Sequence, residues 1–414
     1  MAQPMTAKLE DVRVPLTFIM TGLAIFVLAQ GLLLSGIALL IHGTAQVPYV
    51  LTIAHLLVLG FATMIAMGVM YQLVPVALQV NIHYLPLARW QYRLYVVGVL
   101  GLTWSFYDFS AGRLVSFAAV TVAAILLFEW NLWMTIKDAA RSDIRTAVAS
   151  ALTSLLVTVS LGLWLTLDFF SPHLGVWHER LLTVHILFGT IGWFTMLIVG
   201  FSYKLAPMFT LSHGYESKFG TFAVYGLNAG IAAASVGVLF EWRALIAVGC
   251  FVLLFGFACY GIQLKKILQK RMRKKIDPGV TAALFAIPFS FCSSVLVLVS
   301  GWISGAGVVL EALVYLVIIG WISLTILGYL YKIIPFLWWT HKYGTIIGKQ
   351  KTPSLKEMLH EKRGKVWLTA MFTAASLNTA SVAFHLIRVG TFGQAVFFIV
   401  SFAYAVELAL VLRK

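Results

Sequence analysis

Long apolar runs alternate with short polar connections along nearly the whole chain. About twelve of these runs are long enough to cross the roughly 30 Å hydrocarbon core of a bilayer. They lie near residues 15–42, 48–76, 90–110, 113–136, 146–170, 180–208, 219–240, 243–265, 280–304, 307–338, 366–389 and 391–412. Because a strand edge in lipid would leave backbone groups unpaired, each run is predicted to be a helix. The pattern predicts an all-α polytopic membrane protein with about twelve transmembrane helices, folded as a single transmembrane domain over residues 1–414.

Composition supports a membrane protein and excludes a water-soluble globule. Hydrophobic residues make up 61% of the chain and charged residues 11%, whereas soluble domains are about one quarter charged. The 30 basic residues exceed the 15 acidic ones, and they gather in every second connection, above all in 265–275 and 342–365. Because basic residues stay on the cytoplasmic side, we expect a protein of the cell membrane with both termini in the cytoplasm. The 265–275 run is either a topogenic loop or a binding site for anionic lipid headgroups.

Three segments repeat one pattern at intervals of about one third of the chain. They are 54–75, 186–207 and 314–335. Aligned on their last proline, they share two glycines, an aromatic residue after the first glycine, and a tyrosine: Gly60, Gly192 and Gly320; Gly68, Gly200 and Gly328; Phe61, Trp193 and Trp321; Tyr71, Tyr203 and Tyr331. Small residues recur in membrane helices for packing alone, but agreement in one register favours a true repeat. We predict a pseudo-threefold arrangement of three four-helix repeats, near 1–142, 143–276 and 277–414.

The second and sixth helices carry the stretches HLLVLGF, from His55, and HILFGTIGW, from His185. The predicted twelve helices in three arcs resemble the catalytic subunit of the haem–copper oxidases. The two stretches resemble especially the shorter relatives of that subunit, such as the NnrS family. The resemblance implies that His55 ligates a low-spin haem near the outer face. It also implies that Arg388, after the eleventh helix, binds the haem propionates. A b-type haem, the lipid bilayer, and an electron donor or respiratory partner subunit are the expected partners.

The chain departs from the family where dioxygen would be reduced. The family's H-P-E-V-Y motif is absent, because Ile186 and Leu187 follow His185. In the tenth helix, where the family has haem histidines, Tyr315 aligns with His55. We therefore do not expect a conventional oxygen-reducing oxidase. Whether the chain is an enzyme, such as an oxidoreductase, is left open.

Histidines in the outer third are the candidate ligands, since an ionisable residue inside a membrane is a functional candidate by default. His55 and His385 are the favoured pair for one haem iron, with Arg388 on the same helical side as His385. The alternative is that both hydrogen-bond to neighbouring helices or lie at the headgroup level. His178 and His185 share a face turned away from that of His55. They offer a second site, for copper or another haem, or an interhelical hydrogen bond.

The remaining histidines are weaker candidates. His42 and His173 lie near the outer surface, and His83, His213, His341 and His360 lie in the cytoplasmic connections. We expect the last four to be solvated loop residues.

Two further polar residues in the apolar runs are candidates. Glu311 and Tyr315 are four residues apart and share a helical face near the outer surface. They form a proton or polar site, or Glu311 pairs with Arg388, or Glu311 lies at the headgroup level without a role. Glu129, deeper in the fourth helix, is a weaker candidate of the same kind.

Several other kinds of chemistry are excluded. The three cysteines, Cys250, Cys259 and Cys292, lie in apolar stretches and fit neither a disulfide framework nor a zinc site. No nucleophile–base motif, phosphate-binding glycine loop or nucleic-acid signature is found.

The favoured function is a membrane haem protein that carries electrons, or that binds or senses a small gas such as nitric oxide. The alternatives are a cofactor-free transporter and a non-catalytic assembly or scaffold subunit on the same fold. The scarcity of midplane charges counts against a transporter.

Overall fold

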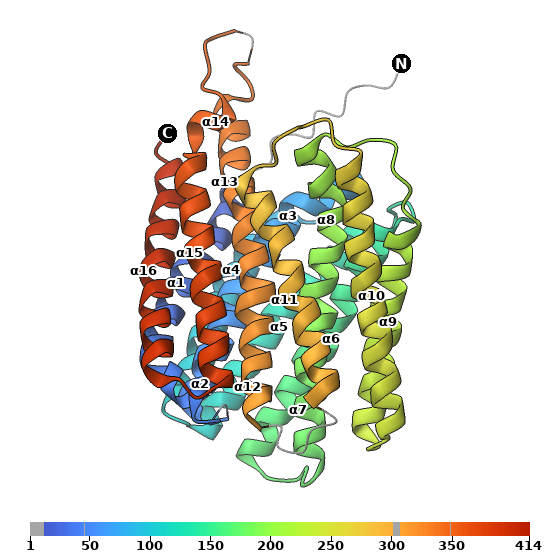
Figure 1. Cartoon of the computed structure of the whole chain (residues 1–414), viewed down its shortest axis with the longest axis vertical. Coiled ribbons are helices and arrows are strands. Elements are labelled where there is room, and N and C mark those ends of the chain that lie inside the picture. The colour runs from blue at the N-terminus through green and yellow to red at the C-terminus, as the bar shows by residue number, and fades with distance from the viewer. Residues whose placement is uncertain (1–11, 45, 301–306, 348) are drawn as a thin grey trace.

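The computed structural model describes residues 12–44, 46–300, 307–347 and 349–414. Long helices run side by side along one axis, which is vertical in Figure 1. Helices α1 and α16 pair antiparallel, because Ile41 contacts His385 while Phe26 contacts Phe397. The start of α1 and the end of α16 therefore lie at the same end of the bundle. The first residues of the chain, 1–11, and the end of the ninth predicted run, 301–304, lie outside the described residues.

Helices make up nearly all of the described chain. Their bounds are α1 Arg13–Ile41, α2 Pro48–His55, η1 Leu56–Thr63, α3 Met64–Leu78, α4 Leu85–Tyr107, α5 Ala111–Ile136, α6 Asp143–Phe170, α7 Trp177–Leu187, η2 Phe188–Thr195, α8 Met196–Thr210, α9 Lys218–Leu239, α10 Arg243–Gln269, α11 Pro278–Ser300, α12 Gly307–Tyr315, η3 Leu316–Ser323, α13 Leu324–Tyr343, α14 Leu355–Met358, α15 Glu361–Ala383 and α16 Ile387–Val411. The segments η1, η2 and η3 are π-helical. Each joins the α-helices before and after it into one continuous helix.

Ten helices of the described residues are long and apolar enough to cross a membrane. This confirms the all-helical, multi-pass character, but with ten candidate spans in place of about twelve. Helix α4 has 23 residues and occupies the position of the third predicted run, yet Arg89 and Arg93 make its first half polar. Helix α11 is described as apolar over Pro278–Phe289, the first half of the ninth predicted run.

The three π-helical segments begin directly after His55, Leu187 and Tyr315, and each has 8 residues. These starting points are equivalent in the predicted repeat. A π-helix bonds residue i to i+5, is rare, and is often found at functional sites. Segment η3 contacts both η1 and η2. The indole of Trp193 donates to Thr63 at 3.2 Å, and that of Trp321 donates to Thr195 at 2.9 Å. Trp193 thus links η2 to η1, and Trp321 links η3 to η2.

The repeated glycines allow a close approach between helices. A Cβ at Gly68 would lie 2.8 Å from the carbonyl oxygen of Pro15 in α1, and a Cβ at Gly328 would lie 2.7 Å from the amide nitrogen of Ala283 in α11. A Cβ at Gly200 would lie 2.9 Å from the Cβ of Ala147 in α6. Only a residue without a side chain leaves the backbones this close.

Candidate functional site

Helix α2 ends at His55, where the backbone widens into η1. The imidazole Nδ1 lies 2.8 Å from the carbonyl oxygen of Leu51, one turn earlier in the same helix. A carbonyl only accepts hydrogen bonds, so Nδ1 carries the proton and Nε2 of the neutral ring keeps its lone pair. The ring also stacks on Phe106 of α4, with ring centroids 4.5 Å apart. His55 is thus held in one orientation, with the lone pair of Nε2 not used by this hydrogen bond.

His185 in α7 is held in the same manner by a different helix. Its Nδ1 lies 2.8 Å from the carbonyl oxygen of Thr158 in α6. Gly162, one turn further along α6, makes room for the ring, because a Cβ there would lie 3.0 Å from Cε1 of His185. The bond to Thr158 assigns the proton to Nδ1, so Nε2 again keeps its lone pair.

His55, at the end of α2, and His185, in α7, lie toward the same end of the bundle (Figure 1). Both histidine side chains are only partly buried. Beside His55, Phe106 belongs to an apolar cluster against which Leu51 and Leu163 of α6 pack. The sequence predicts that His185 faces away from His55, because Leu187 is the aligned residue. In the folded bundle His185 packs against α6, where Gly162 makes room for its ring.

Asp168, which sequence reasoning missed, organises the neighbouring turn. Its Oδ1 accepts from the backbone amides of His173 at 2.7 Å and Leu174 at 2.8 Å. Its Oδ2 accepts from Nδ1 of His178 at 2.7 Å. The signal for it was present, since an acid late in an apolar helix is costly unless it is paired. His178 is thus oriented by a carboxylate.

His173 has partners at both ring nitrogens. Its Nδ1 lies 2.7 Å from the carbonyl oxygen of Ser171, and its Nε2 accepts from the indole of Trp164 at 3.0 Å. This supports a structural role for His173.

His385 has different neighbours from His55. The predicted run 366–389 is interrupted, because α15 ends at Ala383 and α16 begins at Ile387. Between them His385 adopts a left-handed φ of 56°, and its Nδ1 lies 2.7 Å from the carbonyl oxygen of Ile41. The predicted helix over 366–389 therefore ends before His385, which lies in the turn that leads into α16. Arg388 is the second residue of α16 and is exposed.

Glu311 and Tyr315 are both buried, at 6% and 4% exposure. The Tyr315 hydroxyl accepts from the Asn378 amide of α15 at 2.9 Å. That amide also donates to Gln394 of α16, which donates to Gln30 of α1 at 3.0 Å. Tyr315 therefore belongs to a polar network that joins four helices. Glu311 Oε2 has no hydrogen-bond partner among the described residues.

Within the described parts of the chain, no group of three or more His, Cys, Asp or Glu side chains is placed to hold a metal ion. His55 and His185 instead offer two neutral imidazoles. The chain matches no protein-family model and no curated protein.

Proposed function

We propose that this chain is a membrane haem protein related to the catalytic subunit of the haem–copper oxidases. It carries electrons, or binds or senses a small gas such as nitric oxide, at one histidine-ligated haem. The observation that supports this is the pair His55 and His185, with each Nδ1 bonded to a backbone carbonyl. The partner of His55 in this proposal is His185, whereas the sequence favoured His385.

The proposal includes the threefold architecture of twelve helices predicted from the repeat. Three observations support it. The π-helical segments start at equivalent positions. The repeated glycines approach the first helix of their own unit. Trp193 and Trp321 each bond to the preceding unit.

The chain's own residues would prepare this site before any cofactor binds. The carbonyls of Leu51 and Thr158 hold the two Nδ1 protons, which fixes the tautomers and orients both Nε2 lone pairs. Phe106 restricts the rotation of His55 and excludes water from one face of its ring. When bound, a haem would supply a one-electron couple, and a gas would bind its iron only by replacing one of the two histidines.

The site lies at the end of the bundle away from the end of α16, where α2, α7 and α12 are found (Figure 1). We propose that this end faces outward and that both termini are cytoplasmic. The basic residues of 265–275 and 342–365 support that orientation.

The test is a visible spectrum of the detergent-purified full-length protein, oxidised and then dithionite-reduced, with a pyridine haemochrome assay. We expect a Soret band and sharp reduced bands of a six-coordinate b-type haem. His55→Ala and His185→Ala should each remove the six-coordinate spectrum.

Two other histidines, His173 and His385, serve as matched controls. His173→Ala should leave the spectrum unchanged, because both of its ring nitrogens are bonded. His385→Ala should do the same, because His385 lies in the turn between α15 and α16, beside Ile41 and not beside His55. A colourless wild-type protein would reject the haem and favour transport or scaffolding. A spectrum lost in His385→Ala and kept in His185→Ala would reject the assigned ligand pair.

A further inference from the structure

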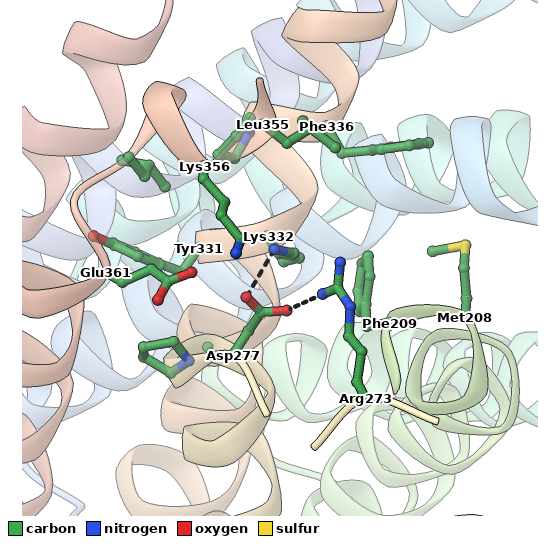
Figure 2. A pocket seen from close by; sticks show the side chains of 14 residues that line it. Met208, Phe209, Arg273, Asp277, Tyr331, Lys332, Phe336, Leu355, Lys356 and Glu361 are labelled. Atoms are coloured by element: carbon green, nitrogen blue, oxygen red, sulfur yellow. Dashed lines mark hydrogen bonds and ion pairs between the residues drawn. The ribbon is translucent and has the colours of Figure 1, made fainter. Parts of the chain in front are cut away.

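A cavity of about 200 Å³ opens at the end of the bundle where α16 ends, far along the chain from the histidine pair. Its walls come from the end of α8, the α10–α11 connection, α13 and the stretch around α14 (Figure 2). A water molecule occupies about 30 Å³ in the liquid. The cavity therefore has room for a group much larger than one water.

The cavity collects charged side chains that point toward one another (Figure 2). Asp277 lies between two cations, with Arg273 Nη1 at 2.9 Å from Oδ2 and Lys332 Nζ at 3.0 Å from Oδ1. Glu361, the other carboxylate of the lining, is 4.0 Å from Lys275. Asp277 is thus paired with two bases, whereas Glu361 and the exposed Lys275 lie at the outer limit of an ion pair.

Lys356 adds a third cation to the lining. Over the part of the chain that the structure describes, no ion pair or hydrogen bond engages its ammonium group. Arg273 and Lys332 each retain further N–H donors beyond those they give to Asp277. N–H donors of Lys356, Arg273 and Lys332 that are not bonded to a carboxylate therefore line this one cavity.

Apolar residues form another part of the same lining, among them Met208, Phe209 and Phe336. An anion that carries an organic tail would place its charge beside the bases and its apolar part on this side. A phosphate group accepts several charge-assisted hydrogen bonds at once, so it suits three separate donors better than a carboxylate does.

We propose that this cavity binds a phosphomonoester group through Lys356, Arg273 and Lys332. The group comes either from a lipid headgroup or from a soluble phosphate ester. Asp277 positions two of the bases and is not itself a ligand. This site is independent of the proposed haem.

The test uses full-length protein in detergent and native mass spectrometry with phosphatidic acid, and phosphatidylcholine as the lipid without a phosphomonoester. Lys356→Gln should weaken phosphatidic acid binding about tenfold, because one charge-assisted hydrogen bond is lost. Lys356→Arg should retain most of the binding. Lys351→Gln is the matched control, since Lys351 is exposed in the same connection and does not line the cavity.

Glycerol 3-phosphate distinguishes the two sources. If it competes with phosphatidic acid, the site takes soluble phosphate esters; if it does not compete, the site requires the lipid. The proposal is overturned if Lys356→Gln binds phosphatidic acid as well as Lys351→Gln does, or if phosphatidylcholine binds equally well. Unchanged thermal unfolding of Lys356→Gln, an exposed position, shows that folding is not the cause.

Discussion

Position 55 in the first predicted unit and position 315 in the third are equivalent, and each precedes a π-helical segment. His55 bonds to its own helix, stacks on Phe106, and remains partly exposed. Tyr315 is 4% exposed and bonds to Asn378 of another helix. The same backbone frame therefore supports a proposed ligand position in one predicted unit and a packing position in the other. The neighbours of the side chain decide which of the two it becomes.

The polar network around Tyr315 has a structural reason. A buried polar group without a partner costs about 1–3 kcal/mol, and Asn378, Gln394 and Gln30 are all fully buried. By bonding to one another and to Tyr315, they join α12, α15 and α16 of the third predicted unit to α1 of the first. Beside His55 the corresponding neighbour is the ring of Phe106.

The largest expected effect comes from making position 55 like its equivalent in the second unit, Leu187. His55→Leu should lower haem affinity at least about a hundredfold, because one axial ligand is lost. Tyr315→His should not create a second haem site, because that side chain meets Asn378. Haem titration of the purified variants measures both effects. Retained six-coordinate absorption in His55→Leu would contradict the comparison.

The next effect concerns the space that holds His185. Gly162→Val should displace the imidazole, since even a Cβ lies 3.0 Å from Cε1, and should weaken haem binding about 10- to 100-fold. Gly261→Ala is the control, because a Cβ there has no neighbour within 4 Å. Equal haem affinity in Gly162→Val and wild type would show that the position of His185 does not matter.

A smaller effect is expected in the third unit. Asn378→Leu should lower the free energy of unfolding by about 1–3 kcal/mol, because the Tyr315 hydroxyl and Gln394 lose a partner in a buried region. The thermal unfolding midpoint in detergent should fall, while the haem spectrum should not change. A changed spectrum with an unchanged midpoint would place Tyr315 at the cofactor site.

The smallest effect tests the links between π-helical segments. Trp321→Phe removes the bond to Thr195 and should cost about 1 kcal/mol. Thr195 keeps its own bond to the carbonyl of Thr190, and phenylalanine already occupies the equivalent position at Phe61. Thermal unfolding measures the change. A loss as large as that of Asn378→Leu would mean that the indole has a further role.

The sequence by itself determined the all-helical, multi-pass character of the protein. Apolar runs of sufficient length leave no alternative to helices in lipid, and the spacing of glycines, aromatics and prolines predicts the repeat. It also placed the candidate histidines toward one end, since depth along a helix follows directly from residue number. The local structure at His385 was not predicted, because the helix is interrupted between Ala383 and Ile387.

Only the tertiary structure decided which side chains meet. His185 packs against α6 because Gly162 admits its ring, and Asp168 orients His178 across a turn. The spacing of apolar residues likewise does not predict the π-helical segment that follows His55. Charges more than fifty residues apart, Asp277 and Lys332, share one cavity. Contacts between helices depend on rotation and close approach, which a one-dimensional pattern of apolar positions does not fix.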